Sequence, residues 1–311
     1  MKKKYLASKH SVTPDERGKV LHYFDITPDE MEELLGVHGL DSHNIASALD
    51  QDEVPRMEYE RGVLTIIWKI PTNFKLTEIS SFNVTTMGIF VTKKNVILIS
   101  TEEKEFFSGS YSISINDLFD IVLIVMDRTI KHFVEHLRVI KMLSKQIQQK
   151  INASMGNEYL LQMFNLSEIL IYYLDAINSN KAVVSKFGAY ADKKGMGDID
   201  FLQDLSIEIE QAARQTEIYS QVFTGLMDAR GSIVNNNMNA LIKKLTIINI
   251  IFLPLNLIAG IGGMSEYSMM TQNFGWPIAY GIFSIAMVAI GIVTYRFLAK
   301  MEGIDKGKKK Q

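Results

Sequence analysis

The sequence predicts an α+β membrane protein with an N-terminal α/β domain, a set of long helices and two C-terminal membrane spans. Two segments, 245–264 and 276–295, contain no Asp, Glu, Lys or Arg in 20 positions each. About 20 apolar residues is the length that a helix needs to cross the hydrocarbon of a bilayer. Upstream, β-branched runs bounded by turn residues predict strands, and long stretches with a period near 3.6 residues predict helices.

The soluble part is expected to occupy residues 1–240. Strands are predicted at 19–26, 62–70 and 87–100, and a helix at 27–37, where Thr27 is a good N-cap residue and Pro28 follows it. We assign residues 1–125 to the α/β part, residues 126–240 to the long helices, and 241–311 to a hairpin with spans at about 245–264 and 276–298. The last long helix, 198–262, has about 65 residues and a length of about 97 Å.

Composition excludes several classes of protein. The chain has 311 residues, no cysteine and a net charge of −2. The lack of cysteine excludes disulfides, thiolate metal sites and cysteine nucleophiles. The near-neutral charge is not that of a nucleic-acid binder. The sequence has no phosphate-binding G-x-x-x-x-G-K-[ST] motif, so ATP-driven pumping is not expected, and we predict no resident cofactor.

Basic residues orient the hairpin. Lys243 and Lys244 precede the first span, Arg296 and Lys300 follow the second, and the loop 265–275 contains no Lys or Arg. The positive-inside rule places both termini in the cytoplasm and the loop outside. Trp276 and Tyr295 stand at the ends of the second span, where aromatic side chains contact lipid head groups. We therefore expect a multi-pass protein of the cell (inner or plasma) membrane.

A polar stripe runs along the second half of the long helix. Its nine members are separated alternately by 4 and 3 residues: Asp228, Ser232, Asn235, Asn239, Ile242, Thr246, Asn249, Leu253 and Asn256. All of them except Ile242 and Leu253 are polar. Asn249 and Asn256 lie inside the uncharged span, where a polar side chain is costly unless it faces protein or water. We interpret the stripe as the lining of an aqueous pore in a homo-oligomer, with apolar rings at Ile242 and Leu253 able to gate it by dewetting. The alternative is that the asparagines join helices by hydrogen bonds.

The run "NNNMNALIKKLTIINIIFLPLNLIAGIGGMSEY" resembles the pore helix and signature loop of the CorA superfamily of divalent-cation channels. The matching positions are Asn236, Asn239, Lys243, Leu245, Thr246, Phe252, Pro254, Ala259, Gly260, Gly263 and Met264. The resemblance extends more weakly over the whole chain. The family's Gly-Met-Asn signature is here Gly263-Met264-Ser265.

The resemblance implies a funnel-shaped homopentamer that conducts divalent cations passively, without enzymatic activity. Mg²⁺ is the family default, with Co²⁺ or Ni²⁺ as further substrates. By position, Asn239 and Ile242 line the pore, Ile242 or Leu245 forms the hydrophobic constriction, and Asn249, Leu253 and Asn256 lie higher in the same pore.

The signature region would form the selectivity entrance at Gly263, Met264 and Ser265, with Glu266 concentrating cations at the mouth. The alternative for Glu266 is an ordinary loop acid. A serine hydroxyl reaches less far than an amide, so Ser265 would make a wider and weaker ring. Because of this departure, two alternatives remain beside the magnesium channel. One is a Zn²⁺ transporter of the same superfamily, and the other is a non-conducting membrane metal sensor.

The resemblance also implies that intracellular cation, bound by cytoplasmic acids, holds the channel closed. Asp204 falls on one such position and Glu78 is its proposed partner; the alternative is that Asp204 is a solvated helix acid. The pattern "HFVEH" at 132–136 matches H-x-x-E-H, a zinc-protease signature. No third ligand is identifiable, so a membrane-tethered metallohydrolase is the weakest of the hypotheses.

Overall fold

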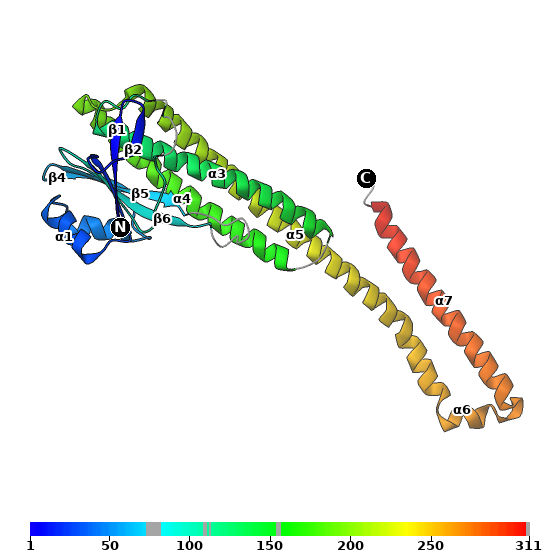
Figure 1. Ribbon diagram of the computed structural model, residues 1–311. Helices are drawn as coiled ribbons and strands as arrows, with labels where there is room; N and C mark the ends of the chain where they lie inside the picture. Colours follow the sequence, from blue (N-terminus) through cyan, green and yellow to red (C-terminus); the bar gives the residue numbers. More distant parts are fainter. Residues whose placement is uncertain (73–81, 108–110, 112, 154–156, 309–311) are drawn as a thin grey trace. The chain divides into compact units, whose positions relative to one another are not determined.

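The computed structural model describes residues 1–72, 82–107, 111, 113–153 and 157–308 (Figure 1). The chain divides into two compact units, Met1–Met227 and Asp228–Gln311. Each unit is described by itself below. Helix α5, Ile199–Gly262, contributes residues to both.

A seven-stranded sheet forms the base of the N-terminal unit. Its strand order is β2-β1-β3-β7-β6-β5-β4, and every neighbouring pair is antiparallel apart from the parallel pair β3 and β7. The predicted strand at 87–100 is a hairpin, with Thr92 N–H donating to the Asn95 carbonyl at 2.9 Å in its turn. The strands are β1 (Lys2–Ser8), β2 (Ser11–Pro14), β3 (Val20–Phe24), β4 (Arg56–Glu60), β5 (Val63–Pro71), β6 (Val84–Val91) and β7 (Val96–Ser100).

Two short helices cover one face of the sheet: α1 (Pro28–Gly36) and α2 (Ser42–Leu49). The predicted helix α1 is confirmed, including its start: Thr27 and Glu30 form a reciprocal capping box. Asp41 caps α2 by accepting from two backbone amides. Apolar residues of both helices pack against Tyr23, Ile97 and Ile99, which belong to the second hydrophobic core of the unit.

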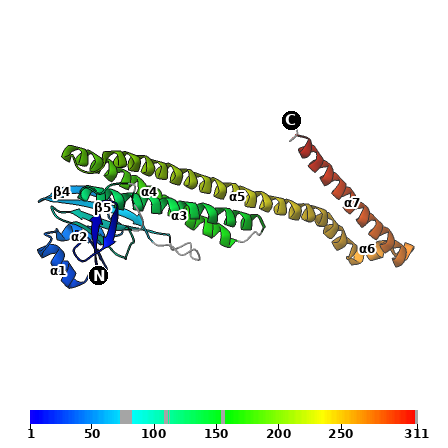
Figure 2. The same ribbon diagram turned by 45° about the horizontal axis from the view of Figure 1, so that its top comes forward.

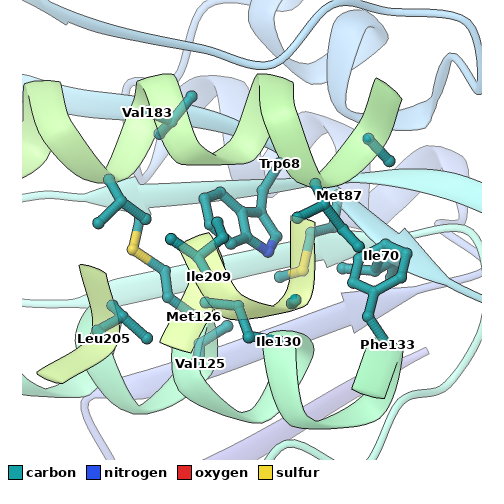
Figure 3. Close-up of a cluster of buried hydrophobic side chains, with 14 of the residues drawn as sticks. Trp68, Ile70, Met87, Val125, Met126, Ile130, Phe133, Val183, Leu205 and Ile209 are labelled. Atoms are coloured by element: carbon teal, nitrogen blue, oxygen red, sulfur yellow. The ribbon is translucent and has the colours of Figure 1, made fainter. Parts of the chain in front are cut away.

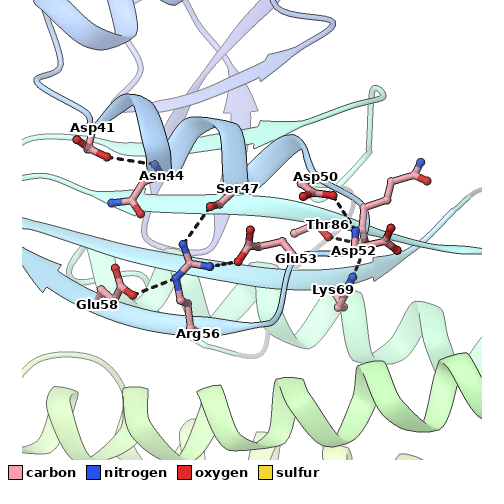
Figure 4. A network of polar contacts seen from close by, with 11 residues as sticks. Asp41, Asn44, Ser47, Asp50, Asp52, Glu53, Arg56, Glu58, Lys69 and Thr86 are labelled. Carbon is pink, nitrogen blue, oxygen red and sulfur yellow. Dashed lines mark hydrogen bonds and ion pairs between the residues drawn. The ribbon is translucent and has the colours of Figure 1, made fainter.

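Arg56 at the start of β4 connects this helix layer to the sheet (Figure 4). Its guanidinium donates to Ser47 Oγ of α2 at 3.0 Å and to Glu58 Oε1 at 3.0 Å, and it pairs with Glu53. Five fixed N–H groups let one guanidinium serve three partners. The contact holds the short edge strand β4 against α2.

Long helices cover the opposite face: α3 (Leu118–Ala153), α4 (Asn157–Lys194) and the first part of α5 (Figure 2). Strand β5 alternates between the layers, since Trp68 belongs to the core beneath the long helices and Ile67 to the core beneath α1 and α2. Figure 3 shows the fully buried Trp68 beside side chains of α3, α4 and α5, including Met126 and Ile209. One large core therefore fixes the start of α5.

Two aspartates at the start of α3 hold the turn from α4 into α5. Asp117 Oδ2 accepts from Gly197 N–H at 2.8 Å, and Asp120 Oδ1 accepts from Asp198 N–H at 2.9 Å. Gly197 has φ +80°, a left-handed conformation that favours glycine. The turn "KKGMGD" (193–198) between α4 and α5 is thus held by residues 80 and 78 positions away in the sequence.

The C-terminal unit consists of the rest of α5, the short helices α6 (Ser265–Met270) and η2 (Gln272–Phe274), and α7 (Trp276–Lys308). Helix α5 has 64 residues, which confirms the prediction of one uninterrupted helix. The predicted external loop contains α6. Within the described residues, three helical stretches are long and apolar enough to cross a membrane: Glu158–Lys194, Ile199–Gly262 and Trp276–Leu298. The first of them packs on the sheet.

Candidate functional site

The polar stripe lies on an exposed face of α5. All nine members of the stripe are exposed in the single chain, and its apolar member Leu253 is 72% exposed. Thr246 Oγ1 donates back to the Ile242 carbonyl at 2.8 Å, so this hydroxyl is satisfied locally. The side-chain amides of the stripe asparagines have no partner among the described residues. Such amides need water or another protein surface.

Helix α7 contacts α5 near the C-terminal end of α5. Ile251, Leu255 and Ile258 of α5 are half-buried, and Leu255 Cδ1 lies 3.7 Å from the position of a Cβ built on Gly291 of α7. At about 100° per residue, Leu253 of the stripe is about 200° around the helix from Leu255. At this level of the helix, Leu253 therefore points away from α7. A single hairpin leaves the stripe uncovered.

The end of α5 is shaped by contact with α7. A Cβ added to Gly262 would lie 2.5 Å from Cζ of Phe283, so glycine permits the close approach of this ring. The Gly262 carbonyl accepts from Tyr280 Oη at 3.3 Å. Neither Gly262 nor Gly263 has a left-handed φ. The small size of Gly262 thus serves packing against Phe283, and its carbonyl has a partner in Tyr280.

The residues that we expect to form the entrance come directly after Gly262 in the sequence. Gly263 N–H donates to the Ala259 carbonyl at 3.0 Å, and Met264, 52% exposed, is the N-cap residue of α6. Ser265 Oγ donates to Glu266 Oε2 at 3.2 Å, and both residues are exposed. The four residues lie together at the junction of α5 and α6. Ser265 thus reaches the carboxylate of its neighbour, and this contact joins the two polar groups of the expected entrance.

An aromatic cluster that we did not predict supports this junction. Tyr267 of α6 lies 6.0 Å from Tyr280 and 5.5 Å from Phe283 of α7, measured between ring centroids. Tyr267 Oη also donates to the Ala279 carbonyl at 3.4 Å. The spacing of Tyr280 and Phe283, three residues apart on one helix face, is the signal in the sequence that would have suggested it. The cluster fixes α6 against α7.

Comparison with known proteins places the chain among transporters. A family model described as a CorA-like Mg2+ transporter protein matches residues 18–300. The chain belongs to the CorA family. The Cobalt/magnesium transport protein CorA of Methanocaldococcus jannaschii is 25% identical over 297 residues, covering 90% of this chain and 89% of that protein. The protein of the same name from Thermotoga maritima is 33% identical over 99 residues, which are 31% of this chain and 28% of that one.

This chain shares its fold with a solved CorA structure over nearly its whole length. The complete structure of the CorA magnesium transporter from Methanocaldococcus jannaschii superposes with a TM-score of 0.73 at 18% identity, covering 95% of this chain and 96% of that one. The expected fold class is confirmed: an N-terminal sheet domain, long helices and apolar C-terminal helices. The family consists of transporters, in agreement with the prediction that the CorA chain is not an enzyme.

The expected regulatory position is on the part of α5 that belongs to the N-terminal unit. Asp204 is exposed there, and Glu78 lies outside the described residues. Burial, the Asp127 carboxylate of α3 and the Asp204 carboxylate raise the pKa of Glu208, one turn after Asp204. We did not predict Asp127 or Glu208, although two acids four residues apart share a helix face. Within the described part of the chain, no three acidic or histidine side chains are arranged to hold a metal ion.

Of the two histidines of "HFVEH", His136 belongs to the core of this CorA chain, and His132 is half-buried. His136 is fully buried, its Nδ1 lies 2.6 Å from Tyr173 Oη, and burial together with His132 lowers the pKa of His136 to about 3. The two rings are in edge contact, with centroids 4.4 Å apart. These contacts support a structural role for the pattern.

Proposed function

We propose that the protein is a passive divalent-cation channel that prefers Mg²⁺ and also accepts Co²⁺ or Ni²⁺, as a homopentamer whose pore is lined by α5. The observation that carries this proposal is the polar stripe along α5, which is exposed in the single chain. Copies arranged around an axis bring their stripes together and surround a water-filled path. The CorA relatives are named as cobalt/magnesium transport proteins, which supports cation transport, and Mg²⁺ is named in the description of the family.

The chemistry of the stripe suits a hydrated ion. Mg²⁺ loses its water reluctantly and keeps octahedral oxygen coordination. Rings of amide oxygens from Asn239, Asn249 and Asn256 accept hydrogen bonds from the water around the ion without removing it. The membrane potential drives entry with about 4.6 kcal/mol for a double charge at 100 mV. The rings of Ile242, Leu245 and Leu253 interrupt this path and supply the closed gate by dewetting.

Selection begins at the junction of α5 and α6. Gly263, Met264 and Ser265 would form the outermost ring, and five copies of Glu266 would raise the local concentration of divalent cations. The Ser265–Glu266 hydrogen bond couples the hydroxyl to this charge. The Asp228 and Asn235 rings lie at the opposite end of the stripe, on the cytoplasmic side.

Intracellular cation would regulate the channel through the acids near Asp204. Burial and the nearby carboxylates of Asp127 and Asp204 raise the pKa of Glu208, so this carboxyl group lies among other negative charges. A divalent cation bound there, completed by groups of a neighbouring copy, offsets that repulsion. Its loss shifts the population towards the open state.

Flux measurements in proteoliposomes test the proposal. Purified protein is reconstituted, and uptake of Mg²⁺, Zn²⁺, Co²⁺ and Ni²⁺ is measured under an imposed potential. We expect Asn239→Leu to reduce Mg²⁺ flux by about tenfold, the effect of a barrier of about 1.4 kcal/mol. Asn237→Leu is the matched control, since Asn237 is two residues away and about 200° around α5.

Each outcome separates the hypotheses. Equal flux in the two variants would refute the pore role of the stripe. A preference for Zn²⁺ in the panel would replace Mg²⁺ by the zinc alternative. No flux of any divalent cation would leave the non-conducting sensor.

A further inference from the structure

The last residue of α5 carries a buried backbone carbonyl that has no partner within its own helix. Gly262 is buried, whereas its neighbours Ile261 and Gly263 are exposed. The last four carbonyl groups of a helix find no N–H partner in that helix. A buried carbonyl that stays without any partner is costly. The Gly262 carbonyl therefore needs a donor from outside α5.

Helix α7 supplies this donor. Tyr280 Oη donates to the Gly262 carbonyl at 3.3 Å. Phe283, three residues further along α7, packs closely against Gly262, since a Cβ built on this glycine would lie 2.5 Å from Cζ of the ring. Residues three apart share one face of a helix. One face of α7 thus both bonds to the end of α5 and covers it.

The same peptide unit is also held from the side of α5. A peptide unit is planar, so the Gly262 carbonyl and the Gly263 N–H form one rigid group and point in opposite directions. The Gly263 N–H donates to the Ala259 carbonyl of α5 at 3.0 Å. The peptide between the two glycines is therefore bonded at both ends, once to α7 and once to α5. The residues of the expected entrance begin directly after it.

We propose that Tyr280 is a positioning residue for the cation entrance. Its hydroxyl fixes the peptide that follows Gly262, and the positions of Ser265 and Glu266 depend on where that peptide points. The same hydrogen bond withholds the Gly262 carbonyl from the ion path. Mg²⁺ demands a nearly ideal octahedron of oxygen atoms, so a displaced ring distinguishes it less well from other divalent cations. The effect on transport rests on the proposed channel function, whereas the effect on the position of Ser265 does not.

Two tyrosine variants separate this hydrogen bond from the packing of the aromatic cluster. Tyr280→Phe removes the hydroxyl and keeps the ring. Tyr267→Phe is the matched control, because it removes the other hydroxyl of the cluster, which donates at 3.4 Å to the Ala279 carbonyl inside α7 and not to the end of α5. The melting temperatures of both variants are compared, since a merely structural contribution lowers this temperature without changing the affinity for the cation.

The first measurement reports the position of the entrance whether or not cations pass. The chain contains no cysteine, so Ser265→Cys accepts a single nitroxide label in the full-length protein in detergent. Electron paramagnetic resonance then measures how mobile the label is. We expect a more mobile label when Tyr280→Phe is added, and an unchanged spectrum when Tyr267→Phe is added.

The second measurement uses unlabelled protein with Ser265 in place. Uptake of Mg²⁺ and of Co²⁺ into proteoliposomes is recorded over a range of concentrations. We expect Tyr280→Phe to raise the half-saturating Mg²⁺ concentration about fivefold relative to Tyr267→Phe, as the loss of one neutral hydrogen bond implies. The ratio of Mg²⁺ to Co²⁺ flux should fall in the same variant.

The outcomes distinguish this inference from the proposed function. Equal label mobility in the two tyrosine variants would overturn the positioning by Tyr280, and so would equal half-saturating concentrations in two conducting variants. A label that loosens only in Tyr280→Phe, in a protein that conducts no divalent cation, would support the positioning and refute the channel.

Discussion

Asn180 of α4 offers a sharp test of how the long helices are attached to the sheet. Strand β4 pairs with β5 only as far as Ile67, so Lys69 lies beyond its end. There Asn180 takes the place of a strand: its Oδ1 accepts from Lys69 N–H at 3.0 Å, and its Nδ2 donates to the Lys69 carbonyl at 2.8 Å. Asn180 is 1% exposed. The amide thus satisfies both outward-facing backbone groups of Lys69.

The substitution Asn180→Leu keeps the number of side-chain heavy atoms and removes both hydrogen bonds. One buried donor and one buried acceptor left without partners cost about 1–3 kcal/mol each. Because Lys69 is only half-buried, water reaches part of this site, and we expect a total loss of about 2–4 kcal/mol in the free energy of unfolding. Loss of this size moves the urea midpoint without changing the m-value, since the surface exposed on unfolding is the same.

The two tryptophans make the assay specific. Trp68 is fully buried beside Lys69, whereas Trp276 of α7 is 77% exposed. A Trp276→Phe background therefore lets fluorescence report unfolding of the N-terminal unit alone. Asn178→Leu is the control, because Asn178 is exposed on the same helix. The reasoning fails if both leucine variants shift the midpoint equally, or if hydrogen exchange at the Lys69 amide is no faster in Asn180→Leu.

Two further predictions concern packing and pH. Gly262→Ala should lower the melting temperature of the detergent-solubilised protein because its Cβ meets the Phe283 ring, whereas Gly260→Ala, with no atom within 4 Å, should not; equal melting temperatures would refute the packing role of Gly262. Burial lowers the pKa of His22 to about 4 from 6.5, so the stability it contributes is complete above pH 6.5 and is lost as the pH falls towards about 4. The free energy of unfolding then changes by at most about 1.4 kcal/mol per pH unit. Urea midpoints over this range should therefore depend less steeply on pH in His22→Gln than in the wild type. An equal dependence on pH in both proteins would contradict this role of His22.

Local rules were enough for several features. The capping box of α1 and the uninterrupted course of α5 follow from neighbouring residues, so the sequence predicted them. The two spans and the position of the polar stripe follow from composition and from the 3.6-residue period. Strands β1 and β4 were missed because they lie near the sheet edges, where lysines and glutamates interrupt the alternation of apolar residues.

Contacts between distant residues decided the rest. That Leu255 of α5 meets Gly291 of α7 depends on packing between two helices. The close contact of Gly262 with Phe283, and the approach of Asp127 to Glu208, likewise join separate segments. A periodic sequence states which residues share a helix face, because the helix itself sets their angles. Which face is buried, and beside which partner, is determined only when the chain packs.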